Sequence, residues 1–363
     1  MPDTAPQGPD WDLLSSYAGL LTLAVGCIYS GAYGALPSPK RPKGEKPTAG
    51  KEDDDEDEEA DVMERMSSED AYMFPIIGSA VLFGLYLVVK FLGTEWINLL
   101  LGWYFSLAGV GAVWKTLTSL VRTVVGEQAW KAFDRFELTQ RSKGRSEVLL
   151  SWRTPSVVLL PFAVLPSIVY RVAQNQGVLT LMANTLAIAF CFTSLAFLKL
   201  DSFKTGSILL SGLFVYDIWW VFGTEVMVKV ATSLDVPIKL LWPKSLTFST
   251  ARGFTMLGLG DVVIPGVFIA LALRYDFHKA GRPRGPYAKP YFTAALAAYV
   301  FGLATTMTVM HTFKAAQPAL LYLSPACVLS FVFTGLARGE LKEAWAWSDE
   351  PEEGGRDDQR KKE

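Results

Sequence analysis

The stretch GSILLSGLFVYDIWWVFGTEVMVKV at residues 206–230 is long and apolar, yet it contains Asp217. A second apolar stretch, GFTMLGLGDVVIPGVFIALAL at residues 253–273, contains Asp261. A carboxylate near the centre of a bilayer costs about 2.5–3.5 kcal/mol on insertion scales. Two carboxylates on consecutive membrane spans can partner each other, so we interpret this pair as the chemical centre of the chain.

Apolar residues are arranged in long runs along the whole chain, and half of all residues are hydrophobic. Runs of about 18 or more apolar residues predict membrane helices, because backbone groups have no water partner in lipid. We therefore expect an all-α membrane protein with nine transmembrane helices. The predicted spans are residues 14–36, 72–92, 96–117, 156–172, 178–198, 206–230, 253–273, 291–313 and 318–337.

A block of acidic residues interrupts the apolar runs near the N-terminus. Residues 52–59 are all acidic, and a block of like charge without apolar residues is usually disordered and solvated, or serves as an interaction segment. We expect a disordered acidic loop at residues 37–70 within an N-terminal transmembrane bundle at residues 1–200.

Basic residues predict the orientation, because Lys and Arg accumulate on the cytoplasmic side of short loops. With nine spans, one side of the membrane receives all but seven of the 34 Lys and Arg residues. The exceptions are Lys90, Arg171, Lys229, Lys239, Lys244, Arg252 and Lys314. The N-terminus should therefore face the lumen or the exterior, and the C-terminus the cytosol.

The two aspartates should meet at one depth. The sixth and seventh spans run antiparallel, and Asp217 and Asp261 lie roughly 17 and 20 Å from the cytosolic ends of their spans at 1.5 Å per residue. Gly258 and Gly260 allow close helix packing beside Asp261. They also make the seventh span an irregular helix. Backbone N–H and C=O groups without a helical partner at this depth must line a cavity or bind a ligand.

Two adjacent carboxylates cannot both ionise cheaply, so the pair would hold one proton between them. This is the arrangement for aspartic proteolysis, in which one member takes a proton from water and the other donates to the scissile carbonyl. The residues do not tell which aspartate carries the proton. Neither a G-x-S-x-G elbow nor an H-E-x-x-H helix is present, and we expect no metal and no cofactor.

Three sequence blocks carry a family resemblance: Tyr216-Asp217 in FVYDIWWVFGTEVMV, the block from Gly258 to Asp261 in MLGLGDVVIPG, and the block from Gln317 to Leu320 in QPALLYLSPA. Together they resemble the signal peptide peptidases, relatives of presenilin among the intramembrane aspartyl proteases. The likeness extends over residues 202–341. Together with the charge pattern, this likeness implies a catalytic transmembrane region at 201–341, after the bundle at 1–200, and a cytosolic tail at 342–363. It implies a presenilin-like fold and an intramembrane-cleaving aspartic endopeptidase of the GxGD type.

The resemblance also implies roles for particular residues. Asp217 and Asp261 would be the catalytic pair. The other residues would shape the site and bind substrate: Tyr216, Gly258, Leu259, Gly260, Gln317, Pro318, Ala319 and Leu320. Pro318 lacks a backbone donor, which would leave exposed backbone groups able to pair with an unwound substrate strand.

The substrates implied by the resemblance are remnant signal peptides and type II membrane proteins, cleaved within their membrane spans. The short loop between the sixth and seventh spans, lumenal by the charge pattern, favours signal peptide peptidases over presenilins. The resemblance further implies a multi-pass protein of the endoplasmic reticulum membrane that self-associates and meets components of ER-associated degradation. We expect no nucleic-acid partner.

Two other functions remain open from the sequence. Paired intramembrane carboxylates also serve as relays in ion or proton transporters, although no clear inverted repeat links the two halves. A non-proteolytic binder of membrane helices in degradation is the second alternative. Cleavage of a signal-peptide reporter, lost when either aspartate is replaced, would separate proteolysis from both.

Overall fold

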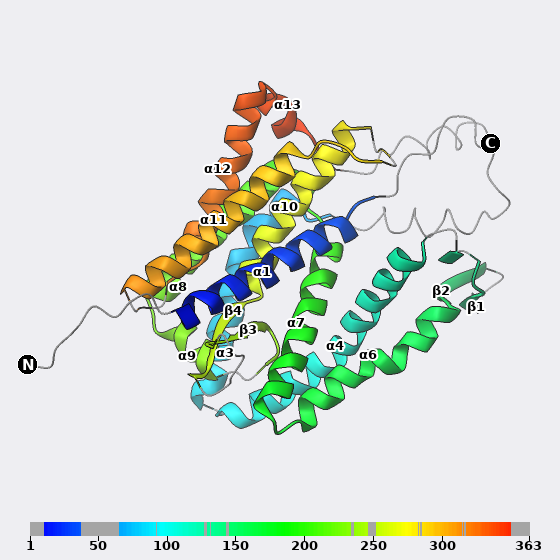
Figure 1. Cartoon of the computed structure of the whole chain (residues 1–363), viewed down its shortest axis with the longest axis horizontal. Helices are drawn as coiled ribbons and strands as arrows, with labels where there is room; N and C mark the ends of the chain where they lie inside the picture. Colours follow the sequence, from blue (N-terminus) through cyan, green and yellow to red (C-terminus); the bar gives the residue numbers. More distant parts are fainter. Residues whose placement is uncertain are drawn as a thin grey trace, which may run out of the picture. The chain divides into compact units, whose positions relative to one another are not determined.

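The structure is a computed structural model drawn in Figure 1. It describes residues 11–37, 65–91, 93–126, 129–130, 132–142, 145–233, 236–245, 252–281, 283, 285–313, 315 and 317–349. The acidic block at 52–59 and most of the predicted tail at 342–363 lie outside these residues.

Helices dominate the described chain. They are α1 (Trp11–Gly34), α3 (Ser68–Phe91), α4 (Thr94–Val125), α6 (Thr154–Val172), α7 (Gln176–Phe197), α8 (Phe203–Phe222), α9 (Val226–Ser233), α10 (Gly260–Lys279), α11 (Pro290–Phe313), α12 (Leu320–Arg338) and α13 (Leu341–Ala346). Two antiparallel hairpins complete the fold: β1 (Arg135–Ser142) with β2 (Arg145–Arg153), and β3 (Lys239–Pro243) with β4 (Phe254–Gly258).

Among the described residues, eight helices are long and apolar enough to cross a membrane, and they lie at eight of the nine predicted spans. They are α1, α3, α4, α6, α7, α8, α11 and α12. The protein is therefore a multi-pass membrane protein with the helical architecture predicted from its sequence. The ninth long helix, α10, has a different composition because it carries Asp261, Arg274 and Asp276.

The seventh span was predicted incorrectly in its first part. Residues 254–258 form strand β4, and the helix begins only at Gly260. The sixth span was also predicted too long, because α8 ends at Phe222 and α9 follows as a separate helix. The backbone groups of β4 that face β3 are satisfied by pairing across the hairpin rather than within a helix.

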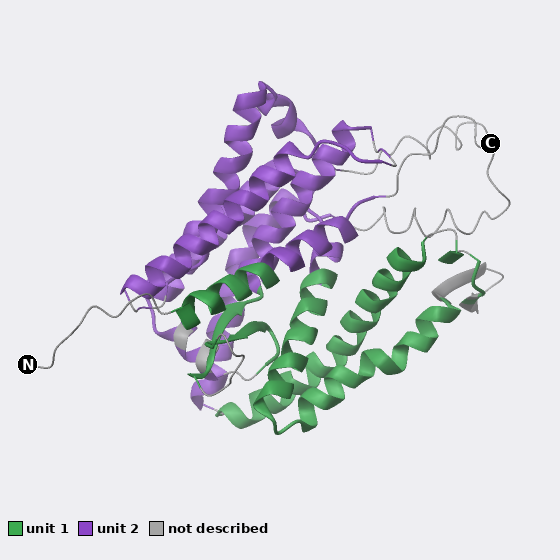
Figure 2. Ribbon diagram, viewed as in Figure 1, with its two compact units in different colours: residues 1–23, 92–193, 234–259 green, residues 24–91, 194–233, 260–363 purple. Residues whose placement is uncertain are grey.

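The chain divides into two compact units that alternate along the sequence (Figure 2). Unit 1 contains Met1–Leu23, Leu92–Thr193 and Leu234–Leu259. Unit 2 contains Ala24–Phe91, Ser194–Ser233 and Gly260–Glu363, and therefore both aspartates.

Helix α10 is the central helix of unit 2. Its residues from Pro265 to Phe277 are buried, and it packs against α8, α11 and α12. The rings of Phe203 and Phe331 stack with centroids 4.1 Å apart, and Phe268 of α10 meets Phe203 edge-on at 5.7 Å. Because protein surrounds α10, this helix can carry charged side chains that a lipid-facing helix would exclude.

The starts of two unit 2 helices are fixed by polar caps. Ser202 accepts a hydrogen bond from the backbone N–H of Thr205 at 3.3 Å and so caps α8. At the start of α3, the Asp70 carboxylate accepts from the backbone N–H of Ser67 at 3.0 Å, while Ser67 Oγ accepts from the Asp70 N–H at 3.3 Å. This reciprocal pairing is a capping box, and it sets where the apolar helix begins.

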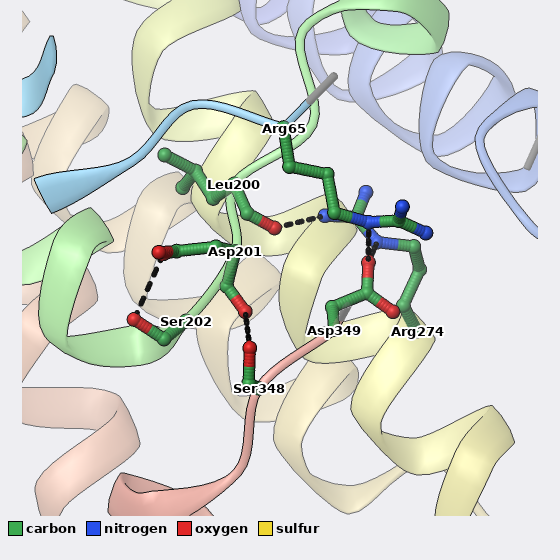
Figure 3. Close-up of polar contacts among 7 residues, drawn as sticks. All are labelled: Arg65, Leu200, Asp201, Ser202, Arg274, Ser348 and Asp349. Carbon is green, nitrogen blue, oxygen red and sulfur yellow. Dashed lines mark hydrogen bonds and ion pairs between the residues drawn. The ribbon is translucent and has the colours of Figure 1, made fainter. Parts of the chain in front are cut away.

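A buried ion cluster joins four segments of unit 2 (Figure 3). Arg274, at the end of α10, donates to the Asp349 carboxylate at 2.7 Å and to the carbonyl of Leu200 at 3.2 Å. Arg65 donates to the same Asp349 oxygen at 3.4 Å. The backbone N–H of Asp349 in turn donates to the carbonyl of Asp201 at 2.6 Å. The segment after α13 is thereby tied to the start of α8.

We expect the Asp349→Ala variant to lower the stability of the protein by about 3 kcal/mol, because breaking a buried ion pair leaves an uncompensated charge. The Arg274 side chain is only 1% exposed and would keep its charge without its carboxylate partner. Thermal unfolding of purified protein measures the loss. The control is Glu225→Ala, which removes an 88% exposed carboxylate from a surface pair with Lys229 and should change little. Equal shifts for the two variants would contradict this account of the cluster.

Candidate active site

Asp217 is buried on the inner face of α8. The buried residues of this helix include Gly206, Leu210 and Leu213, which recur at helical spacing, and Asp217 continues the same stripe. Asp217 is only 3% exposed. Its Oδ2 accepts a hydrogen bond from the backbone N–H of Leu320 at 3.0 Å. The hydrogen-bond donor to this buried carboxylate is thus a backbone N–H that lies 103 residues later in the sequence.

The partner of Asp217 is the first residue of helix α12. The first N–H groups of a helix have no acceptor within the helix, and the positive end of the helix dipole favours an anion there. The residue before the helix, Ala319, has no side chain able to cap these groups. The Asp217 carboxylate supplies the missing acceptor from α8. This contact brings the predicted block from Pro318 to Leu320, which is buried, against the aspartate.

Asp261 lies in the first turn of α10 and is partly exposed. The Asp217 carboxylate is close enough to act on that of Asp261 electrostatically. The backbone carbonyl of Asp261 accepts a hydrogen bond from the hydroxyl of Tyr299 at 3.3 Å. The two aspartates predicted as a pair therefore lie near each other within unit 2, and their catalytic role stays a prediction.

The other residues singled out in the sequence lie at varied positions. Tyr216 is half-buried, with its ring centroid 6.3 Å from that of Trp220. Within the described part of the chain, no hydrogen bond joins the Tyr216 hydroxyl to either aspartate. Gln317 is half-buried just before α12, and its Oε1 accepts from the Tyr322 hydroxyl at 3.4 Å. Gly258 ends β4, Leu259 is buried, and Gly260 opens α10.

The register of the β3–β4 hairpin fixes which backbone groups point outward. Leu259 N–H donates to the carbonyl of Ile238 at 3.1 Å, and Lys244 N–H donates to that of Gly253 at 2.9 Å. Hydrogen-bonded pairs alternate with non-bonded pairs in an antiparallel ladder, so the pair of Leu241 and Met256 is non-bonded. The backbone groups of Leu241 and Met256 therefore point away from the partner strand.

Asn184 of α7 occupies the outer edge of β3. Its Oδ1 accepts from the backbone N–H of Leu241 at 2.8 Å, and its Nδ2 donates to the Leu241 carbonyl at 2.7 Å. The side-chain amide thus takes the place of a neighbouring strand and anchors the hairpin to α7 within unit 1. On the other edge, β4 pairs with β3 alone among the described strands, so the backbone groups of Met256 and Gly258 remain open there.

Asn184 and Tyr299 were not predicted as site residues from the sequence. Asn184 could have been noticed as a polar residue within an apolar span, because such residues usually have a partner. Tyr299 offers no comparable signal, since tyrosine is common in membrane spans. The partner of neither residue can be read from spacing along the chain.

A family model described as signal peptide peptidase matches residues 57–351. A signal peptide peptidase from Homo sapiens is 37% identical over 352 residues, which cover 96% of this chain and 86% of the relative. A probable intramembrane protease from Schizosaccharomyces pombe is 33% identical over 82% of this chain and 89% of its own length. Intramembrane protease 2 from Caenorhabditis elegans is 45% identical over a shorter part, 46% of this chain and 38% of the relative.

Proposed function

Because the chain belongs to the signal peptide peptidase family and is therefore an intramembrane protease, we propose that it is an aspartic endopeptidase of the GxGD type whose catalytic pair is Asp217 and Asp261. The observation that carries this proposal is the buried Asp217 carboxylate at the start of α12, with the Asp261 carboxylate near enough for the two to interact electrostatically. The family offers no support for the alternative of an ion or proton transporter.

The two aspartates have different surroundings, which suggests different roles. A backbone N–H and a helix N-terminus both stabilise negative charge, and Asp217 meets both at Leu320. We therefore assign Asp217 as the ionised base and Asp261 as the acid that carries the shared proton.

Peptide hydrolysis then follows from these assignments. The Asp217 carboxylate takes a proton from a water molecule while the water oxygen bonds to the carbonyl carbon of the substrate. The proton of Asp261 passes to the carbonyl oxygen, which gives a tetrahedral diol. Asp217 returns its proton to the amide nitrogen as the C–N bond breaks, and Asp261 recovers a proton from the diol. The products are a carboxylic acid and an amine, and no covalent enzyme intermediate forms.

A substrate helix must unwind before its peptide bonds can react, and β4 offers a template for the extended segment. Strand addition uses main-chain hydrogen bonds at an open sheet edge. The open groups of Met256 and Gly258 lie directly before the residues that lead into Asp261. We propose that the substrate pairs with this edge of β4, while Asn184 closes the opposite edge of the hairpin.

Met256→Pro tests this pairing, because proline removes an outward N–H without removing a bond to β3. We expect kcat/KM for a signal-peptide reporter to fall about five- to tenfold, the effect of roughly one net hydrogen bond. Met256→Ala keeps the backbone donor and should stay near wild type, although it removes a side chain that is 61% exposed. The same kcat/KM for the two variants would reject strand addition at Met256.

We also propose the substrates, the location and the partners of this protein. The substrates are remnant signal peptides and membrane proteins of type II orientation. The protein resides in the endoplasmic reticulum membrane with a lumenal N-terminus and a cytosolic C-terminus, and it associates with itself and with degradation components. The division into a bundle at 1–200, a catalytic region at 201–341 and a cytosolic tail at 342–363 is proposed on the same basis.

The direct test is cleavage of a type II signal-peptide reporter by the purified protein in lipid vesicles. We expect two peptide products whose masses place the cut within the apolar segment of the reporter. Absence of cleavage by purified protein, in vesicles that retain bound reporter, would refute the proposed activity and favour a non-proteolytic binder of membrane helices.

A further inference from the structure

Helix α10 contains Pro265, which lies four residues after Asp261. In an α-helix each N–H bonds to the carbonyl four residues earlier, and Pro265 has no N–H to offer. The carbonyl four residues before Pro265 is that of Asp261. The sequence of α10 therefore removes the usual helical partner from the backbone of a proposed catalytic residue. A backbone carbonyl left without a partner away from water is unfavourable, so a donor from another residue stabilises it.

The donor comes from the neighbouring helix. The Tyr299 hydroxyl of α11 donates to the Asp261 carbonyl at 3.3 Å. Tyr299 is fully buried, and α10 and α11 pack against each other in unit 2. A buried tyrosine is held rigidly by its surroundings and has few rotatable bonds, so its hydroxyl defines a fixed point.

Packing beside Pro265 restricts the helix further. A Cβ atom built on Gly266 would lie 2.8 Å from Leu195 Cδ2, which shows how closely α10 approaches this side chain. The helix cannot shift freely in this region. In the first turn of α10, before Pro265, the Asp261 carbonyl accepts the hydrogen bond from the Tyr299 hydroxyl.

We infer that Tyr299 is a positioning residue that replaces the N–H missing at Pro265 and thereby fixes the direction of the Asp261 side chain. The carbonyl and the carboxyl of Asp261 share one Cα atom, so anchoring the carbonyl limits rotation of the turn from which the carboxyl projects. This inference rests on the proposed catalytic role of Asp261. In this role Tyr299 acts through Asp261 and needs no contact with the substrate.

The experiment compares kcat and KM for Tyr299→Phe, Pro265→Ala and the double variant in the reporter assay. We expect Tyr299→Phe to lower kcat about tenfold with KM nearly unchanged, because a misdirected acid affects the chemical step more than binding. Pro265→Ala restores a helical N–H four residues after Asp261. The double variant should therefore have a higher kcat than Tyr299→Phe alone.

Tyr275→Phe is the matched control. Tyr275 is a 2% exposed tyrosine of α10 whose hydroxyl has no hydrogen-bond partner among the described atoms. Removing that hydroxyl should leave kcat at the wild-type value. If Tyr299→Phe does not yield folded protein, the rescue is measured as recovery of folded protein when Pro265→Ala is added.

The decisive quantity is the kcat of the double variant divided by the kcat of Tyr299→Phe, or the same ratio of the two yields of folded protein. A ratio above one supports the inference, and a ratio of one or less overturns it, as does a Tyr299→Phe variant that behaves like Tyr275→Phe. These failures differ from failure of the proposed function, which would appear as retained cleavage in Asp261→Asn. If Asp261→Asn loses cleavage but Pro265→Ala does not rescue Tyr299→Phe, only the role of Tyr299 is rejected.

Discussion

Replacing either Asp217 or Asp261 by asparagine should lower reporter cleavage by about a thousandfold or more, because each variant removes one partner of the acid–base pair. Asparagine has nearly the shape of aspartate but cannot exchange a proton with water or with a carbonyl oxygen. The Oδ1 of an asparagine at position 217 can still accept the N–H of Leu320, so the start of α12 should keep its structure. Cleavage rates in vesicles measure the effect.

Three further measurements show whether the loss of cleavage comes from the acid–base pair. Substrate binding should persist in both asparagine variants, since the reporter is held by contacts outside the carboxyl groups. The control Glu225→Gln removes an exposed carboxylate and should cleave like wild type. The variant carrying both replacements should be no slower than either single variant, because residues that act as a unit are not additive. A single variant that retains substantial cleavage would exclude the pair as the catalytic centre.

Leu320→Pro should lower the rate of cleavage about 10- to 100-fold, because it removes the backbone donor to Asp217, and hydrogen bonds to charged groups are strong. Proline is tolerated at the first position of a helix, so α12 should still form. The Asp217 carboxylate would then lose both its orientation and the donor that stabilises its charge. Rates under single-turnover conditions report the chemical step directly.

Two matched variants separate the lost donor from other consequences of Leu320→Pro. Leu321→Pro places the same residue in the same helical turn and restricts its predecessor equally, but it removes an N–H that donates to the carbonyl of Pro318. Leu320→Ala keeps the donor to Asp217 and removes only side-chain atoms. Both should retain more activity than Leu320→Pro. Similar losses in the two proline variants would mean that the start of α12 matters as a whole and that the single bond does not.

The sequence predicted much of the fold because lipid allows few backbone conformations. Long apolar runs in a membrane must satisfy their own hydrogen bonds, so eight spans could be placed from hydropathy alone. Asp217 was also identifiable, because a carboxylate within an apolar run is rare enough to require an explanation. Its neighbour Leu320 followed from the family resemblance and could not have been derived from spacing.

The rest depended on contacts between residues far apart in the sequence. Four of the five residues of β4 are apolar, the exception being Thr255, and a short apolar run does not distinguish a strand from part of a helix. The hairpin is decided by its pairing with β3 and by Asn184, which lies more than fifty residues earlier along the chain. Pro265 was visible in the sequence, but its consequence for Asp261 required Tyr299 to be located.

The most direct test of the central claim is the binding of a peptide isostere in which a hydroxyl-bearing carbon replaces the scissile carbonyl. Such a molecule resembles the tetrahedral diol and should bind tightly only where both carboxyl groups contact its hydroxyl. We predict tight binding to wild type and at least about a hundredfold weaker binding to Asp217→Asn and to Asp261→Asn alike. Unchanged affinity in either variant would show that the two aspartates do not hold the reacting carbon between them.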